Sequence, residues 1–274
     1  MVTCSCHLLV DTMKVAVGTF IVGFFLHCMF SRAALSTTAS RMRQSKHLWI
    51  VRHGQALHNP RAEAAKEAGC SFDEFLELMR QDDALDADLT ELGRNQARDV
   101  AQTLKIDGLE LIVSSPLSRA IETADIVVPA NQAVRRVAIE SFREINGWLV
   151  NAKRRSKTEL GEKFPLWDFG ELSTEQDALW TEELESQQDC SERGYRGLCW
   201  IMNRPEHRIL LACHGGILRY TMDDHPMVRM VDGRTNPAER SVKARFSNCE
   251  VRRYRIESED MDDNETIVLT ELDF

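Results

Sequence analysis

Two short apolar runs in this chain end in a histidine followed by a glycine. Residues 48–51 lead into Arg-His-Gly at 52–54, and residues 209–213 lead into His-Gly-Gly at 214–216. Runs of this length are typical of strands that are buried on both faces, as in parallel sheets. Because open α/β sheets bind ligands at the carboxyl ends of their strands, these endings predict one crevice that contains both histidines. Gly54 is expected to let the backbone turn tightly there.

The rest of the chain alternates strand-like runs with helix-like patterns, which predicts a single α/β domain around one large core. Strands are expected at 48–51, 109–113, 137–139, 209–213, 251–256 and 267–272. Helices are expected at 72–81, 91–105 with Thr90 as N-cap, 117–127 and 175–203.

A third segment places a cation at the start of a helix. Ser115 suits the N-cap and Pro116 the first turn, so Arg119 falls near free backbone N–H groups at the positive end of the helix dipole. A phosphate can bind at such a helix start. The alternative is a surface Arg with its stem packed on apolar neighbours. With cations around the phosphoryl oxygens, a neutral imidazole in line with phosphorus can attack it as a nucleophile.

Glu144 is the candidate proton donor. It lies in Arg-Glu-Ile-Asn-Gly at 143–147, shortly after an expected strand. Protonating a departing alkoxide requires an acid, and a neighbouring phosphate dianion favours the protonated form of a carboxyl group. The alternative is an ordinary ion pair with Arg143.

Four motifs, taken in order, resemble those of branch 1 of the histidine phosphatase superfamily, the phosphoglycerate mutase-like proteins. They are Arg-His-Gly-Gln-Ala-Leu-His-Asn at 52–59, Leu-Thr-Glu-Leu-Gly at 89–93, Ser-Ser-Pro-Leu-Ser-Arg-Ala at 114–120 and His-Gly-Gly at 214–216. Each motif alone is weakly specific, but their order and spacing over about residues 47–256 are strongly so. The resemblance implies a three-layer α/β/α sandwich with a mostly parallel central sheet.

The resemblance also implies a role for each matching residue. His53 would be the nucleophile that becomes a phosphohistidine, and Glu144 would be the proton donor. Asn59 would donate a further hydrogen bond, and this role is inferred from the resemblance alone. The residues expected to hold the phosphoryl oxygens are Arg52, Arg119 and His214.

The domain at 47–274 contains an insert at about 146–180. Residues 142–180 resemble the corresponding region of plant phosphoglycerate mutase-like proteins, and such an insert commonly lies over the pocket in this superfamily. There Arg154 or Arg155 would touch an anionic substrate. The alternative, which charge patterning favours, is a solvated basic turn.

Two departures from the cofactor-dependent mutases favour hydrolysis. Those enzymes carry Arg-His-Tyr-Gly after their acidic residue and usually His-Gly-Asn at the second histidine, whereas this chain has Arg-Glu-Ile-Asn-Gly and His-Gly-Gly. A mutase must also retain its phosphorylated intermediate, while a phosphatase only has to admit water. We therefore expect a metal-independent phosphatase without a cofactor. The alternatives are mutase-type phosphoryl transfer and a non-catalytic, membrane-tethered binding protein.

The first 46 residues differ from the rest in charge. They carry a net charge of +4. Because the whole chain has a formal net charge of −9, residues 47–274 carry −13. The acidic charge of residues 47–274 argues against nucleic acid as a partner, because a protein needs a basic surface to neutralise nucleic acid phosphates. The expected partner is a small phosphorylated substrate that is bound by local cations.

An apolar run at 15–30 lies within this leader. It is shorter than the ~20 residues that comfortably span a bilayer. With Lys14 before it and small residues after it, the run predicts a signal peptide, and the acid-free stretch at 36–46 is similar to organelle transit sequences. A retained membrane anchor is the alternative. Localisation thus stays open between the secretory pathway, an organelle, a membrane and the cytoplasm, as does the oligomeric state.

No metal site is expected. The eight cysteines include no Cys-x-x-Cys pair, and Cys213 and Cys249 are expected in the core. A cluster of four aspartates lacks the ligand spacing of a known metal site and is expected as a solvated loop. Its members are Asp82, Asp83, Asp86 and Asp88.

Overall fold

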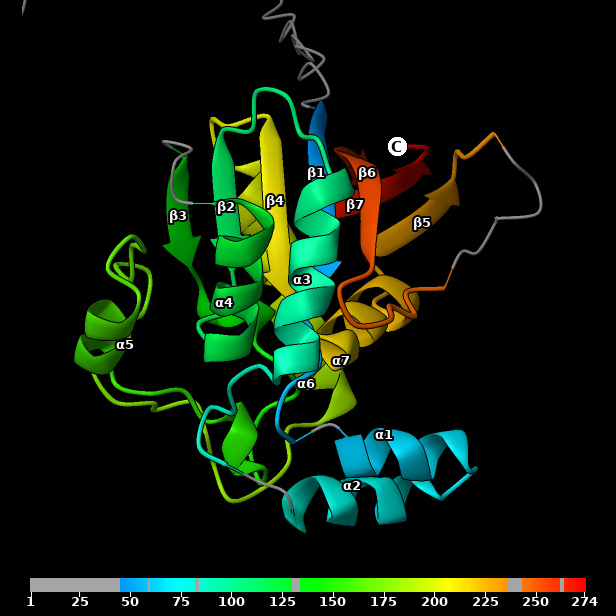
Figure 1. Ribbon diagram of the computed structural model, residues 1–274. Coiled ribbons are helices and arrows are strands. Elements are labelled where there is room, and N and C mark those ends of the chain that lie inside the picture. Colours follow the sequence, from blue (N-terminus) through cyan, green and yellow to red (C-terminus); the bar gives the residue numbers. More distant parts are fainter. Residues whose placement is uncertain (1–44, 59, 82–83, 130–133, 236–242, 262–263) are drawn as a thin grey trace, which may run out of the picture. The chain divides into compact units, whose positions relative to one another are not determined.

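The computed structural model describes residues 45–58, 60–81, 84–129, 134–235, 243–261 and 264–274 (Figure 1). The apolar run at 15–30 and the substrate-binding candidate Asn59 lie outside these ranges. Within the ranges, every helix is too short or too polar to cross a bilayer.

Seven strands of the described residues form one sheet, in the order β3-β2-β4-β1-β6-β7-β5. Neighbouring strands run parallel except at β6, which is antiparallel to both β1 and β7. The mostly parallel sheet confirms the expected fold class. The strands are β1 (Ser45–Arg52), β2 (Leu111–Ser114), β3 (Arg135–Ala138), β4 (Arg208–Cys213), β5 (Val228–Asp232), β6 (Val251–Met261) and β7 (Asn264–Leu272).

Helices cover both faces of this sheet (Figure 1). They are α1 (Pro60–Glu67), α2 (Phe72–Gln81), α3 (Glu91–Thr103), α4 (Ser118–Val127), α5 (Lys157–Lys163), α6 (Gln187–Met202) and α7 (Gly215–Arg219). Two 3₁₀ turns at Glu140–Phe142 and Val150–Ala152 and a π-helical turn at Tyr220–Asp224 complete the described elements.

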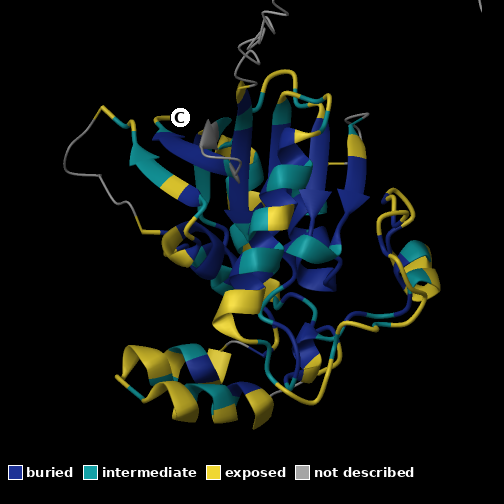
Figure 2. Cartoon of the chain, turned by 180° about the vertical axis from the view of Figure 1, so that it is seen from behind, coloured by how far each residue is buried: buried dark blue, intermediate teal, exposed yellow. Residues whose placement is uncertain are grey.

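The two-residue period of the central strands produces the layers. On β1, Leu48 and Ile50 pack into the core that includes α6 and α7, whereas Trp49 and Val51 pack into the core that includes α3 and α4. Successive side chains of a strand point to opposite faces, so a strand that is apolar throughout requires a cover on each side. The central strands β1, β2 and β4 are accordingly buried along most of their length, while the outward faces of the helices are exposed (Figure 2).

Most expected elements are present near their predicted bounds. Helix α2 matches its expected range, and Thr90 caps α3 by accepting a hydrogen bond from the Gly93 amide. Cys213 and Cys249 are buried, as expected, and free of disulfides. These agreements concern an N-cap and an apolar spacing, and both signals depend only on residues that are close together in the sequence.

Four elements differ from the prediction. The helix expected over 175–203 begins only after Ser186, whose side chain accepts a hydrogen bond from the Asp189 amide. Helix α1, strand β5 and helix α5, which follows the basic stretch, were not expected. A capping box of Ser156 and Glu159 opens α5, so the signal for this helix was present in the sequence.

Gly54 allows a close backbone approach rather than a tight turn. Its φ lies outside the positive range that glycine alone adopts readily. A Cβ at Gly54 would lie 2.5 Å from the carbonyl oxygen of Gly93, and a Cβ at Gly93 would collide with the carbonyl oxygen of Gln55. The end of β1 and the start of α3 therefore pack backbone against backbone, which joins the motifs at 52–59 and 89–93.

We expect Gly93→Ala to destabilise the fold by about 1–3 kcal/mol, because the new methyl group must displace backbone atoms. Gly161→Ala in helix α5 is the matched control, since a Cβ at this position would have no neighbouring atom within 4 Å. This control should stabilise the protein by up to about 1 kcal/mol, because alanine loses less backbone entropy in a helix. Urea unfolding of both variants measures the difference. Equal stabilities would show that the backbone contact is not tight.

Candidate active site

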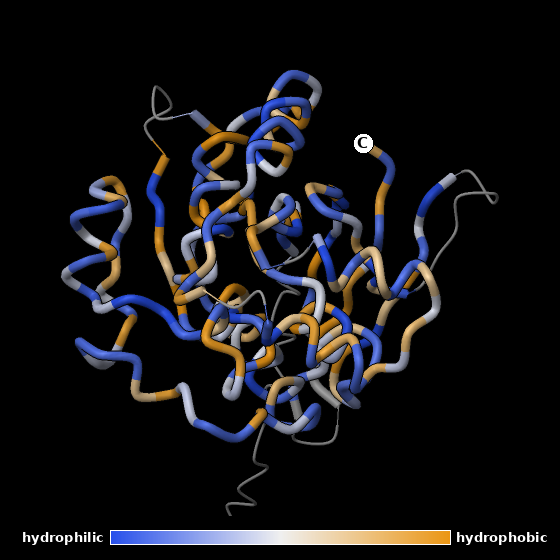
Figure 3. The backbone as a smooth tube through the Cα atoms, turned by 60° about the horizontal axis from the view of Figure 1, so that its bottom comes forward, coloured by the Kyte–Doolittle hydropathy of each residue, from blue (hydrophilic) through white to orange (hydrophobic). Residues whose placement is uncertain are grey.

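A cavity of about 560 Å³ opens at the carboxyl edge of the sheet, between the ends of β1 and β4 and the helices α1 and α2. Figure 1 shows this helix pair below the strand ends, and Figure 3 brings the same side forward. Of the residues expected in the site, Arg52, His53 and Glu144 line the cavity, whereas Arg119 and His214 are fully buried without lining it. A second cavity of about 650 Å³ is lined by none of the expected residues.

Backbone contacts hold His53 at the end of β1. Its amide donates to the Cys213 carbonyl at 3.0 Å, and its carbonyl accepts from Asn248 Nδ2 at 3.1 Å. The ring Nδ1 lies 2.7 Å from the Gly54 carbonyl oxygen. Because a carbonyl oxygen can only accept, Nδ1 carries the proton and Nε2 keeps its lone pair.

Two further histidines flank His53. Its ring centroid lies 4.9 Å from that of His214 and 6.3 Å from that of His58. His214 Nε2 lies 2.8 Å from Ser115 Oγ, and this contact joins the ends of β2 and β4. His58 lines the cavity but was missed as a site residue, although it belongs to the same motif as His53.

Burial lowers the pKa of all three histidines well below 6.5. The positive charges of Arg119 and Arg52 lower these pKa values further, since a second cation nearby disfavours the imidazolium form. The imidazoles are therefore neutral at pH 7. Only the neutral ring has a lone pair with which to attack an electrophile.

Backbone carbonyls anchor the two guanidinium groups of the site. Arg52 Nη1 donates to the Phe246 carbonyl at 2.9 Å, and its Nη2 donates to Glu63 of α1 at 3.2 Å. Arg119 Nη1 donates to the Asn151 carbonyl at 2.8 Å. Each planar guanidinium is thereby held in one orientation, so the directions of its remaining N–H groups are fixed as well.

The start of α4 differs from the prediction, because a carboxylate from another loop caps it. The helix begins at Ser118, and Ser115 does not cap it. Asp86 Oδ1 accepts from the Ser118 amide at 2.7 Å and Oδ2 from the Ser118 hydroxyl at 2.5 Å. The Ser118 amide at this helix start is thus engaged by Asp86 and is not available to a phosphate.

Asp86 belongs to the aspartate cluster that was expected to be solvated, but it is not solvated itself. Its side chain is fully buried, and burial raises its pKa to about 6, against the opposing effects of Ser118 and Arg119. The sequence prediction of a solvated loop is wrong at this position. The long-range partner, α4, could not be identified from the local pattern of aspartates.

Glu144 is held by amides rather than by Arg143. Its carboxylate oxygens accept from the amides of Ile145 at 2.9 Å, Gly216 at 3.1 Å and Ile217 at 3.0 Å. A Cβ at Gly216 would collide with the carboxylate, so this glycine makes room for it. The contacts join the segment at 143–147 to the helix after β4 and bring Glu144 to the cavity.

Arg143 pairs instead with Asp177, at 2.8 and 2.6 Å. Arg154 lies in the same network: its Nε donates to Glu140 at 2.7 Å, and its other nitrogens donate to backbone carbonyls of residues 155 and 174–176. Arg154 is buried, so it is neither a solvated turn nor a residue of the cavity wall.

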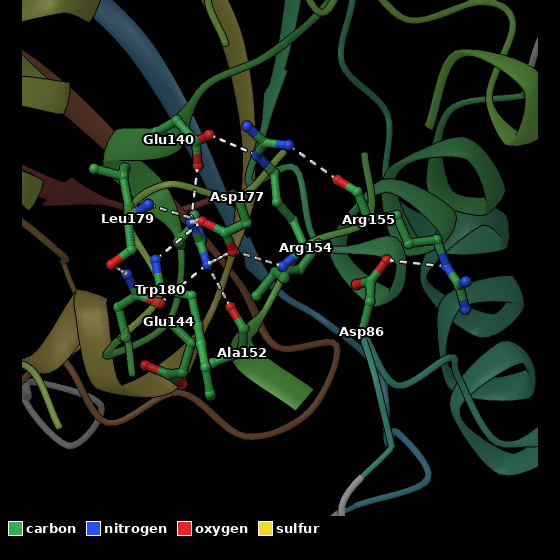
Figure 4. Close-up of polar contacts among 12 residues, drawn as sticks. Asp86, Glu140, Glu144, Ala152, Arg154, Arg155, Asp177, Leu179 and Trp180 are labelled. Carbon is green, nitrogen blue, oxygen red and sulfur yellow. Dashed lines mark hydrogen bonds and ion pairs between the residues drawn. The ribbon is translucent and has the colours of Figure 1, made fainter. Parts of the chain in front are cut away.

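Arg155 Nε lies 3.6 Å from Asp86 and does not line the cavity either (Figure 4). The expected contact of Arg154 or Arg155 with substrate therefore does not fit this arrangement. The physical reason is that the carboxylates of Glu140 and Asp86 already attract these guanidinium groups inside the fold. A count of basic residues could not reveal those partners, which lie far away in sequence.

The family model of the histidine phosphatase superfamily (branch 1) matches residues 48–259. Phosphoglycerate mutase-like protein 1 of Arabidopsis thaliana is 29% identical over 248 residues, covering 77% of this chain and 81% of that protein. A second phosphoglycerate mutase-like protein of the same plant is 27% identical over 243 residues, covering 77% and 84%. A solved mycobacterial glucosyl-3-phosphoglycerate phosphatase has a TM-score of 0.47 at 20% identity, covering 83% of this chain and 98% of that chain.

We expect the stability of the protein to depend on the charge of Asp86. Burial raises the pKa of the Asp86 carboxyl group from 3.8 to about 6. The folded state therefore binds the carboxyl proton more tightly than the unfolded chain does, and stability is lost as pH rises through about 6. The side chain of Asp86→Asn stays neutral. The unfolding free energy of the wild type minus that of the variant should therefore fall by up to about 3 kcal/mol between about pH 4 and pH 7.

Urea unfolding at the two pH values measures this difference, and Asp88→Asn, two residues away and partly exposed, is the matched control. A difference that stays constant between the two pH values would contradict the raised pKa of Asp86.

Proposed function

This chain belongs to branch 1 of the histidine phosphatase superfamily, and we propose that it hydrolyses phosphomonoesters through a phosphohistidine on His53. The observation that carries the proposal is the contact of 2.7 Å between His53 Nδ1 and the Gly54 carbonyl oxygen. It leaves Nε2 unprotonated on a side chain that lines the cavity. A neutral imidazole beside two guanidinium groups is suited to attack phosphorus.

In the first step, His53 Nε2 forms a bond to phosphorus while the bond between phosphorus and the alcohol oxygen breaks. Arg52, Arg119 and His214 stabilise the charge on the phosphoryl oxygens. Glu144 gives its proton to the departing alkoxide, so that a neutral alcohol leaves. The Gly54 carbonyl stabilises the positive charge that develops on the ring, because it accepts from Nδ1.

In the second step, water attacks phosphorus and the bond between phosphorus and Nε2 breaks. The Glu144 carboxylate takes a proton from this water, inorganic phosphate leaves, and His53 returns to its neutral form. Every proton and every bond in the cycle is accounted for by substrate, water, His53 and Glu144. The proposed cycle calls on neither a metal ion nor a cofactor.

Glu144 needs a source for the proton that it donates. Its oxygens accept three amide hydrogen bonds, so the carboxylate acts as an acceptor in this structure. A substrate that enters as the monoanion carries the required proton with it.

Mutase-type phosphoryl transfer is the second candidate, because the curated relatives are named phosphoglycerate mutase-like proteins. Transfer requires that the phosphohistidine be kept from water until an acceptor is bound, whereas hydrolysis requires only water. The Arg-Glu-Ile-Asn-Gly and His-Gly-Gly segments, where cofactor-dependent mutases carry other residues, favour hydrolysis.

We expect His53→Ala to reduce phosphate release from an aryl phosphate by about 10³-fold or more, because the nucleophile is lost. His207→Ala, at the exposed residue that precedes β4, is the matched control and should retain wild-type turnover. Wild-type turnover should also persist in EDTA. Rapid-quench labelling should trap an acid-labile phosphoenzyme in the wild type and in His207→Ala but not in His53→Ala.

Full turnover by His53→Ala would contradict the proposed mechanism. Transfer between the carbons of phosphoglycerate without release of inorganic phosphate would establish the mutase instead. Any turnover that depends on His53 would eliminate a purely non-catalytic binding protein.

We expect kcat/KM to follow a bell-shaped pH profile. Its acidic limb should lie below pH 6.5, because burial lowers the pKa of His53 and the neutral ring is the reactive form. In Glu144→Gln the leaving group is no longer protonated. Alkyl phosphates should then lose about 10²–10⁴-fold in kcat/KM, and aryl phosphates with acidic leaving groups much less.

Asp168→Asn is the control for this variant, because Asp168 pairs with Arg135 and does not line the cavity. An unchanged dependence on the leaving group in Glu144→Gln would assign the proton to a different acid.

A further inference from the structure

The apolar stripe of α2 faces the cavity. Phe72, Phe75, Leu76 and Met79 are spaced at helical positions i, i+3, i+4 and i+7, and all four line the cavity. Such a stripe normally packs into a core, and the exposure that it retains must be explained. Met79 alone is buried, while Phe72 remains 52% exposed.

Apolar side chains from other elements line the cavity as well. Ile145 and Leu149 come from the segment after β3, Leu184 from the loop before α6, and Phe246 from the segment before β6. Segments far apart in the sequence thus contribute to one apolar surface. This surface continues directly from the phosphate-binding groups, because Arg52, His53 and His58 line the same cavity.

The cavity therefore changes in character along its length. Arg52 and the histidines lie at the strand ends, and aromatic and aliphatic groups lie on the α2 side. The Lys66 ammonium of α1 lies there as well, 5.6 Å from the centroid of the Phe75 ring. A ligand that matches both parts carries a phosphate at one end and a sizeable apolar group at the other. Full burial of such a group contributes about 1.5–3 kcal/mol, which corresponds to about 10–100-fold in affinity.

We propose that the alcohol portion of the substrate is a large apolar group, aromatic or branched, that packs on the apolar stripe of α2. This inference rests on the proposed function, because it takes the phosphoryl group to lie at His53. It identifies α2 as the element that sets specificity and excludes a small hydroxy acid as the preferred alcohol.

Binding of non-hydrolysable phosphonates tests the proposal independently of turnover. We expect 2-phenylethylphosphonate to bind the wild-type protein about 10–100-fold more tightly than methylphosphonate in calorimetric titrations. Lys66, Arg219 and Arg245 also line the cavity, so 2-carboxyethylphosphonate tests the opposite preference. Equal affinities, stronger binding of the carboxylate compound, or no binding of any phosphonate would overturn the proposal.

Phe72→Ala provides the decisive variant, because a half-exposed side chain can be removed without damage to the core. It should reduce the preference for 2-phenylethylphosphonate about 3–10-fold and leave the affinity for methylphosphonate unchanged. Leu92→Ala, 53% exposed on α3 and outside the cavity, is the matched control. A preference that is the same in both variants would also overturn the proposal.

Turnover separates this proposal from the proposed function. Glycerol phosphate and 2-phenylethyl phosphate have alkoxide leaving groups of similar basicity, so their ratio of kcat/KM reports on contacts with the alcohol. Release of phosphate from both at similar rates, abolished by His53→Ala, would refute the apolar specificity and leave the phosphatase in place. Selective phosphonate binding without turnover would have the opposite meaning.

Discussion

The parallel pairing of β1 with β4 is the contact on which the site depends. In this register Arg52 is the partner of Cys213, so the next residue of each strand is a histidine. The amide of His53 continues the ladder to the Cys213 carbonyl, and the two rings come to lie 4.9 Å apart. A shift of one residue would send the side chains of β1 to the opposite faces of the sheet and separate the histidines.

Buried charges hold the loops around these strand ends. Asp86 caps α4 beside Arg119, and Arg143 forms a bidentate pair with Asp177 of the insert. Removing one partner of such a pair leaves an uncompensated charge in a region of low dielectric constant. Burial, followed by the charges of Arg119 and Arg52, lowers the pKa values of the three histidines and keeps them neutral. Arg119 thus acts on both Asp86 and His53.

The polar network and the apolar helix pair have different consequences for the cavity. The insert is tied to the domain by buried ion pairs, and it contributes the carbonyl of Asn151 to Arg119. Helix α2 instead presents apolar side chains to the cavity and keeps part of them exposed. The first arrangement orients the groups around phosphorus. The second leaves an apolar surface for the remainder of a ligand.

The sequence by itself determined the α/β class, the bounds of α2, the cap of α3 and the two strands that end in histidine, because each signal lies within a few neighbouring residues. Only the tertiary structure decided that Asp86 occupies the start of α4, that Arg154 is buried among carbonyls and that the stripe of α2 faces a cavity. In each of these cases the partner lies on a distant segment. A side chain's type and spacing show which partner it requires, but only the folded chain determines which partner comes within contact distance.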